Sequence, residues 1–161
     1  DNMIEDIKID SLKSNFDTID KGITEAKEKI VYDRFPIFGY DNISANIDLS
    51  RQNSRRILIH NYIRFKKAEI CDFKPEKPGV IIINPPYGER LGEGNELSNL
   101  YHLMGDVLKT NCQDADAFIL SGNLELSKYI GLKPENKIPL KNGKIDCRLL
   151  HYPIRDGKYA D

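Results

Sequence analysis

The stretch GVIIINPPYGERLGEG, residues 79 to 94, decides the fold because it joins a buried strand to a rigid corner. Residues 80 to 84 (VIIIN) are apolar on both faces, which is typical of a strand in a parallel sheet that helices cover on each side. Pro85 and Pro86 then end the strand, because proline lacks the N–H that a sheet needs and fixes its own φ angle. The sequence therefore predicts an α/β sheet with a stiff turn at the carboxyl end of this strand.

Outward from this stretch, extended and helical patterns alternate along the chain. Further strands are predicted at residues 35 to 41 (FPIFGYD), 62 to 70 (YIRFKKAEI) and 115 to 123 (ADAFILSGN), with a loop at 71 to 79. Apolar residues at helical spacing predict helices at 42 to 59, 95 to 111 and 124 to 132, and one or two helices within 4 to 31. Residues 137 to 154 predict a hairpin around Asn142-Gly143. This order predicts an open α/β sheet, mainly parallel, with an antiparallel edge.

Composition limits the possible classes of protein. The chain has 161 residues, 40% of them hydrophobic and 30% charged, and its mean hydropathy is -0.50. These values indicate one soluble domain, and no apolar run is long enough to span a bilayer. The formal net charge of -1 neither supports nor excludes an RNA partner. Three widely separated cysteines predict reduced thiols in a cytoplasm, with no disulfide and no metal site.

Side chains with chemical potential follow two of the predicted strands. Asp41 closes the strand at 35 to 41, and Asn84-Pro85-Pro86-Tyr87 follows the strand at 80 to 84. Ligands collect at the carboxyl ends of strands in open α/β sheets, so we expect both positions on one sheet edge. Each motif alone also has a simpler, purely structural explanation. Asn-Pro-Pro-Tyr could be only a turn, and Asp41 could only cap the next helix.

Together the two motifs suit the methylation of an aromatic amine, whose lone pair is delocalised into the ring. An Asn side-chain oxygen and a fixed backbone carbonyl can accept the two N–H bonds and turn the lone pair toward an electrophilic methyl group. Proline rigidity would hold that carbonyl in place. A neighbouring Tyr offers a flat face on which an unstacked base can lie.

Three motifs resemble one family of enzymes. NPPYGERLG resembles motif IV of class I, S-adenosylmethionine-dependent amino-methyltransferases, in the form found in guanine-N2 RNA methyltransferases. FPIFGYD resembles their acidic motif, and LKNGKIDCRLLHYPI resembles the last hairpin of 23S ribosomal RNA methyltransferases of the RlmL type, whose catalytic domain follows an RNA-binding THUMP domain. The resemblance runs from about Phe35 to Ile154. NPPY is shared with DNA adenine and protein glutamine methyltransferases, so these remain alternatives.

The resemblance implies a Rossmann-like sheet and roles for particular residues. Asp41 would accept the ribose hydroxyls of S-adenosylmethionine. Glu69, where the family usually has Asp, would contact the adenine amine, with the Ile70 amide beside it. No metal is implied.

The resemblance assigns the substrate side of the site to the corner. Asn84 and the Pro85 carbonyl would hold the guanine amine, Pro86 would stiffen the corner, and Tyr87 would stack on the base. Arg90 could contact an RNA phosphate, although a solvated surface Arg is the commoner case.

One part of the family's pattern is absent. Members open with a strand and a glycine-rich loop that holds the methionine part of the cofactor, and no such motif precedes residue 35; Gly92-Glu93-Gly94 follows the wrong strand. The strand would lie between those ending at Asp41 and Asn84. Since the chain also starts at Asp1, we expect a partial catalytic domain, with a helical lead-in (1 to 34), an α/β core (35 to 154) and a tail (155 to 161).

Two consequences follow from this expectation. The 161-residue chain alone should bind S-adenosylmethionine weakly or not at all and be inactive. The flanking strands could pair directly, or another chain, such as a second copy in a homo-oligomer, could fill the gap. A non-catalytic RNA-binding module is the alternative of a different class.

Overall fold

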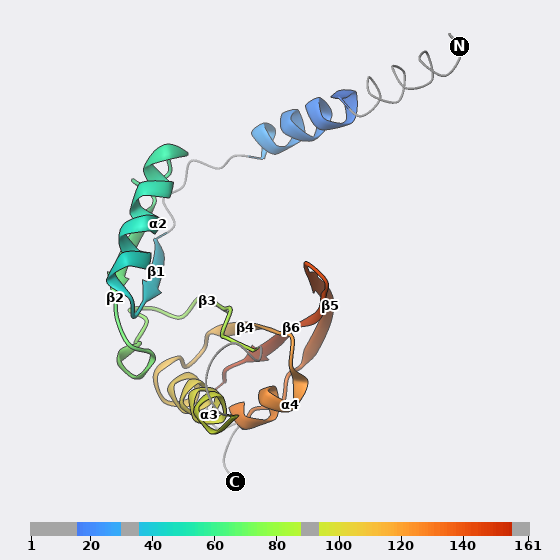
Figure 1. Ribbon diagram of the computed structural model, residues 1–161. Helices are drawn as coiled ribbons and strands as arrows, with labels where there is room; N and C mark the ends of the chain where they lie inside the picture. Colours follow the sequence, from blue (N-terminus) through green and yellow to red (C-terminus); the bar gives the residue numbers. More distant parts are fainter. Residues whose placement is uncertain (1–15, 30–35, 88–93, 156–161) are drawn as a thin grey trace, which may run out of the picture.

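The computed structural model describes residues 16–29, 36–87 and 94–155 (Figure 1). After a helix at residues 16–28, the elements are β1 (Ile37–Asp41), α2 (Ser44–Arg56), β2 (Ile63–Lys67), η1 (Ile70–Asp72), β3 (Val80–Ile83), α3 (Gly94–Asn111), β4 (Asp116–Ser121), α4 (Leu124–Ser127), η2 (Lys128–Ile130), β5 (Asn136–Asn142) and β6 (Ile145–Pro153). All four predicted strands, the predicted hairpin and the helices after residue 36 are therefore confirmed in type and order.

The strands form two separate sheets rather than one. β1 pairs in parallel with β2, while β3, β4, β6 and β5 form a four-stranded sheet in that order. Within the larger sheet β3 is parallel to β4, and β6 is antiparallel to both β4 and β5. The parallel pairing of β1 with β2 and of β3 with β4, and the antiparallel C-terminal hairpin, are as predicted. β1 and β3 do not pair with each other, so the flanking strands leave the gap open instead of closing it.

The larger sheet has its own core on the face that α3 and η2 cover (Figure 1). Apolar residues of α3 repeat at helical spacing and bury Tyr101, Met104 and Leu108 against Ala117 and Ile119 of β4. These side chains are almost wholly removed from water, so hydrophobic burial stabilises the part of the molecule built on the larger sheet. This part is called the larger half below, and the part built on β1, α2 and β2 is called the smaller half.

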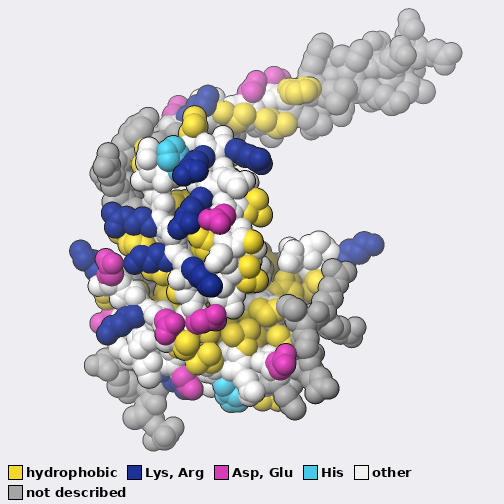
Figure 2. Space-filling view, turned by 60° about the vertical axis from the view of Figure 1, so that its left-hand side comes forward, with side chains coloured by type: hydrophobic (Ala, Val, Ile, Leu, Met, Phe, Trp, Pro, Cys, Tyr) yellow, Lys and Arg dark blue, Asp and Glu magenta, His cyan; other side chains and the backbone are white. Residues whose placement is uncertain are grey.

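The prediction that the strand at 80 to 84 is buried on both faces is wrong. Ile81 and Ile83 pack against the core, but Val80 and Ile82 are 69% and 77% exposed. The reason is that no described helix covers the second face of the larger sheet. Figure 2 shows hydrophobic side chains along the open space between the two halves of the molecule.

The smaller sheet packs against α2. Gly39 of β1 lies beneath the ring of Phe65, and a Cβ atom at Gly39 would come within 2.7 Å of that ring. Only Ile47 and Ser54 of α2 are buried. This half therefore has a much thinner core.

The segment after β2 connects the two halves. Phe73 follows η1 and meets the ring of Tyr40 edge to face, with 5.2 Å between the ring centroids. It also packs against the core of the larger sheet, and its carbonyl accepts a hydrogen bond of 2.9 Å from Asn111. Phe73 thus contacts both halves.

Details outside the sheets also follow the sequence. Gly131 ends η2 with φ of 65°, a left-handed conformation that glycine adopts readily at a helix end. The hairpin turn consists of Gly143, with φ of 61°, and Lys144, so Asn142 is the last residue of β5 rather than part of the turn. All three cysteines are free thiols. No helix among the described residues is both long and apolar enough to cross a membrane.

Candidate active site

The carboxyl ends of β1 and β2 bring the two predicted cofactor acids together. The Ala68 amide donates to the Asp41 carbonyl over 3.1 Å, which holds the two strand ends side by side. Asn42, the residue after Asp41, donates a hydrogen bond of 3.2 Å from its side-chain amide to Glu69 Oε2. Glu69 is exposed, and Ile70, the first residue of η1, packs against the core of the larger sheet.

Asp41 also anchors the start of α2. Its Oδ1 accepts from the Ile43 amide at 2.7 Å, and the Asn46 side chain donates to both oxygens at 3.2 and 3.1 Å. The N-cap residue is Ile43, and no side chain caps α2, so Asp41 is not the helix cap; it holds the residue that precedes the helix and one side chain of the first turn. The fixed carboxylate is half-buried and keeps acceptor capacity for further donors, because an ionised carboxylate offers about four lone-pair sites.

The Asn-Pro-Pro corner lies directly after β3. Asn84 is exposed, and its side chain makes no hydrogen bond to any other described residue. Pro85 is buried, and the Pro86 carbonyl accepts a hydrogen bond of 3.3 Å from the Tyr101 hydroxyl. Burial raises the pKa of Tyr101, against an opposing hydrogen bond with Ser121, so the hydroxyl keeps its proton and can donate. The Tyr101 hydroxyl therefore holds the corner, while the Asn84 side chain has no hydrogen-bond partner among the described residues.

Tyr87 is held by the C-terminal hairpin and the β4–α4 turn. Its hydroxyl accepts from the Asn142 side chain at 2.6 Å and lies 3.7 Å from Cys147 Sγ. A Cβ atom at Gly122 would come within 2.6 Å of the Tyr87 ring, so only glycine leaves room for the ring in this place. The ring is half-buried and fixed at both its edge and its hydroxyl.

Sequence reasoning missed three residues that position the corner: Tyr101, Gly122 and Asn142. The sequence indicates Asn142 only as a residue of the hairpin and Gly122 only as part of the strand segment 115 to 123, and neither signal reveals a contact with Tyr87. Tyr101 occurs at a helical core position, and nothing in its spacing distinguishes it from any other core residue.

The two groups of site residues are not on one sheet edge, contrary to the expectation. Asp41 and Glu69 belong to the smaller sheet and Asn84 to the larger one, with no strand pairing between them. Arg90 lies outside the described residues, as do Gly92 and Glu93. Among the described parts of the chain, no group of His, Cys, Asp or Glu side chains is arranged to hold a metal ion.

Taken together, these features define the class. Parallel strands that end in an acid and in an Asn-Pro-Pro-Tyr corner, followed by a C-terminal antiparallel hairpin, form part of a class I methyltransferase fold. The structure of SMU.472 in complex with SAH matches with a TM-score of 0.74 and 30% identity, over 84% of this chain and 36% of that one. A possible methylase from Clostridium difficile 630 matches with a TM-score of 0.73 and 29% identity, over 85% and 37%.

Sequence comparisons specify the family. Residues 5–151 match the family of RMKL-like methyltransferase domains (UPF0020), and the chain belongs to it. The ribosomal RNA large subunit methyltransferase K/L of Syntrophotalea carbinolica is 36% identical over 128 residues, and that of Methylococcus capsulatus is 33% identical over 143. These alignments cover 76% and 86% of this chain but 18% and 19% of the relatives, so the chain spans about a fifth of their length.

Proposed function

We propose that this chain forms part of the catalytic domain of an S-adenosylmethionine-dependent methyltransferase that modifies the exocyclic N2 amine of guanine in 23S ribosomal RNA. The observation that carries the proposal is the exposed Asn84 side chain, which has no partner among residues 16–29, 36–87 and 94–155 and lies on a corner that Tyr101 and two prolines hold rigid. The names of the relatives support ribosomal RNA as substrate, and the SAH complex of SMU.472 supports the cofactor. The chain would contribute a lead-in (1 to 34), a core (35 to 154) and a tail (155 to 161).

The corner suits an amine because it offers acceptors rather than a base. The Asn84 side-chain oxygen and the Pro85 carbonyl would accept the two N–H bonds of the guanine amine. The lone pair would then point out of the acceptor plane, and positioning would supply most of the rate enhancement. Tyr87, fixed by Asn142 and Gly122, would present its open face to the base.

The residues at the ends of β1 and β2 fit the cofactor's polar groups. Asp41 holds a preorganised carboxylate that can accept ribose hydroxyls, and Glu69 offers an exposed carboxylate for the adenine amine. When bound, S-adenosylmethionine supplies a methyl group on a sulfonium centre. Because these acids and Asn84 belong to separate sheets, we expect the 161-residue chain alone to bind the cofactor weakly and to be inactive.

Replacing Asn84 with Ala in the full-length protein tests the proposal. With labelled S-adenosylmethionine and 23S ribosomal RNA, we expect kcat to fall by about 10²- to 10³-fold, the cost of losing one oriented polar group in a catalytic site. Asn136→Ala, an exposed asparagine of β5, is the matched control and should keep wild-type activity. Unchanged methyl transfer in Asn84→Ala would remove the amine-orienting role.

The separation of the two sheets favours one alternative, a non-catalytic RNA-binding module. The same assay separates the candidates when DNA and protein substrates are included and the methylated product is identified by mass spectrometry. Label found as N2-methylguanosine supports the proposal, and label in adenine or glutamine supports another NPPY methyltransferase. RNA binding by the wild-type protein without any methyl transfer supports the module.

A further inference from the structure

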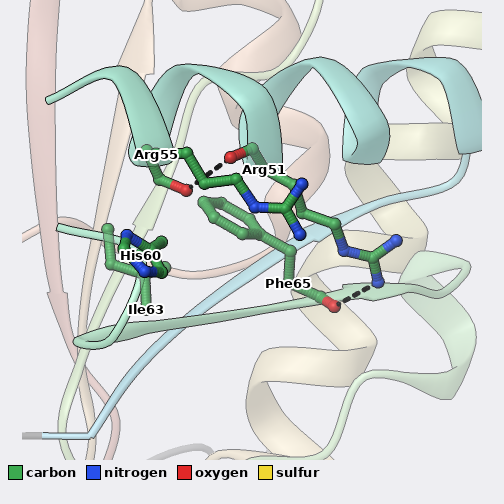
Figure 3. A pocket seen from close by; sticks show the side chains of 6 residues that line it. Arg51, Arg55, His60, Ile63 and Phe65 are labelled. Atoms are coloured by element: carbon green, nitrogen blue, oxygen red, sulfur yellow. Dashed lines mark hydrogen bonds between the residues drawn. The ribbon is translucent and has the colours of Figure 1, made fainter. Parts of the chain in front are cut away.

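A basic hollow lies on the smaller half of the molecule, between the last two turns of α2 and the start of β2 (Figure 3). It has a volume of about 200 Å³ and is lined by Arg51, Ser54, Arg55, His60, Ile63 and Phe65. This volume is below the roughly 300 to 1,000 Å³ of ordinary small-molecule pockets. The hollow can therefore take one compact group rather than a whole nucleotide.

The two arginines are arranged side by side, one turn of helix apart. Figure 3 shows their side chains extending in the same direction along the hollow, with the Arg51 guanidinium beside the Phe65 carbonyl. Like charges at this spacing on a helix repel each other, so an anion between them would relieve the repulsion. The chemistry of the hollow is that of an anion site.

Arg51 is preorganised, whereas Arg55 is not committed. The Arg51 guanidinium donates to the Phe65 carbonyl and to Asp48, each over 3.1 Å. The Arg55 guanidinium makes no hydrogen bond or ion pair with any described residue. A fixed guanidinium beside one that has no partner in the described part of the chain is suited to bidentate contacts with phosphate oxygens.

The surrounding surface favours a polyanion over a free ion. Figure 2 shows Lys and Arg side chains gathered over the part of the molecule formed by α2 and β2. The basic residues on these two elements are Arg51, Arg55, Arg56, Arg64, Lys66 and Lys67. Arg64 and Lys66 alternate along β2 with Ile63 and Phe65, which line the hollow, so these two lie on the opposite face of the smaller sheet. The chain as a whole carries a formal net charge of -1, so this concentration of positive charge is local.

We propose that this hollow binds a phosphate of the RNA backbone, with Arg51 and Arg55 holding the phosphate oxygens. The proposal rests on the proposed function in taking RNA as the partner. Ser44 at the start of α2 lies near Asp41, and Arg55 is about 16 Å further along the helix at 1.5 Å per residue. The contact therefore lies at the far end of α2 from the proposed cofactor acid, and it would set affinity rather than the chemical step.

A structural explanation for the arginines must be separated from this one. Arg55 and Arg56 both lie in the last turn of α2, where positive charge stabilises the helix dipole. Arg56 does not line the hollow, so it is the matched control for charge at the helix end. Arg55→Lys is a second variant that keeps the charge and the dipole effect but loses the planar fork.

The experiment measures binding of a 23S ribosomal RNA fragment to the full-length protein by fluorescence anisotropy at a series of salt concentrations. For Arg55→Ala we expect weaker binding and a plot of log K against log salt that is shallower by about 0.7 to 0.9, the value for one phosphate contact. Arg56→Ala should keep the wild-type slope, and Arg55→Lys should keep the slope with weaker binding. In methylation assays Arg55→Ala should raise KM and leave kcat unchanged.

Equal slopes for wild type and Arg55→Ala, or an equal loss in Arg55→Ala and Arg56→Ala, would overturn the proposal. Inorganic phosphate distinguishes the other source of the same chemistry. If phosphate stabilises the wild type against heat but not Arg55→Ala, while RNA binding is the same for both, the hollow holds free phosphate and the RNA assignment is wrong. A slope difference in a protein that transfers no methyl group would leave the anchor in place and refute the proposed function alone.

Discussion

The two sheets of this molecule differ in the size of the hydrophobic core that stabilises each of them. The larger sheet carries the Asn-Pro-Pro-Tyr corner and a core in which Tyr101, Met104 and Leu108 are almost fully buried. The smaller sheet carries the acids at Asp41 and Glu69, and α2 buries only two side chains against it. Since burial is the main source of stability, the proposed substrate residues stand on the stable half and the proposed cofactor residues on the weak half.

The difference implies that the smaller half depends on its contacts with the larger half for stability. Its connection to the larger core runs through Phe73, which meets Tyr40 on one side and the α3 core on the other. Regions with few buried contacts open locally at low free-energy cost. A cofactor contacted by both halves would therefore stabilise the smaller one, because ligands stabilise the state that binds them.

The largest expected effect comes from the core of the larger half. A Cβ atom at Gly105 of α3 would lie 1.8 Å from the Ile130 carbonyl oxygen, so Gly105→Ala must force α3 and η2 apart. We expect a loss of about 3 kcal/mol in the free energy of unfolding, at the upper end for overpacking. Urea denaturation measures it. Gly79→Ala, where no atom lies within 4 Å, is the control and should change little.

The connection between the halves gives the next largest effect. Phe73→Ala removes the ring that contacts Tyr40 and the α3 core, at a cost of about 2 kcal/mol for a half-buried aromatic side chain. Hydrogen exchange should speed up across β1, α2 and β2 while β4 and β6 stay protected. Uniform faster exchange in both sheets would show that the halves unfold together and would break the comparison.

The fold was largely predictable because its signals are local. The apolar runs at Val80 to Ile83 and within residues 116 to 121 predict strands, and the apolar spacing in α3 predicts its helix, whatever surrounds them. The exposure of Val80 and Ile82 was not predictable, since the same apolar run suits a covered strand and an uncovered one. The local sequence predicts that a segment is a strand, but whether a helix covers each face of that strand depends on which other elements are present.

The candidate site was predictable only in part, for a related reason. Asp41 ends β1 and Asn84 follows β3, and the order of the elements along the sequence is enough to place both at the carboxyl ends of strands. Their separation on two sheets could not, because it depends on what fills the gap. The contacts of Tyr87 with Gly122 and Asn142 join residues far apart in sequence, and no local pattern specifies such pairs.

A smaller effect on stability, with a clear effect on activity, is expected at Gly122. The methyl group of Gly122→Ala would come within 2.6 Å of the Tyr87 ring, which can rotate away because it is a half-buried side chain. We expect about 1 kcal/mol of destabilisation and a raised KM for RNA in the full-length protein. Tyr87→Phe is the companion variant, since it keeps the ring and loses only the hydroxyl contact with Asn142. A normal KM in Gly122→Ala would show that the ring does not hold the base.

The smallest expected effect depends on pH and belongs to the larger half. A hydrogen bond with His151 and another with Arg155 lower the pKa of Asp116 at the start of β4, over distances of 2.8 and 3.1 Å. A carboxyl whose folded pKa is lowered stabilises the fold above its unfolded pKa, near 3.8, and loses that contribution as pH falls through the folded pKa.

Acid titration of the free energy of unfolding should therefore show a loss below about pH 4 that is smaller in Asp116→Asn than in the wild type. The effect is expected to be modest, because Asp116 is partly exposed and exposed ion pairs contribute little. Asp146→Asn, which removes the surface pair with Lys141, is the control and should follow the wild-type curve. If Asp116→Asn also follows it, the acid sensitivity of the larger half resides elsewhere, and the pair at the base of β4 serves only to orient Arg155 and His151.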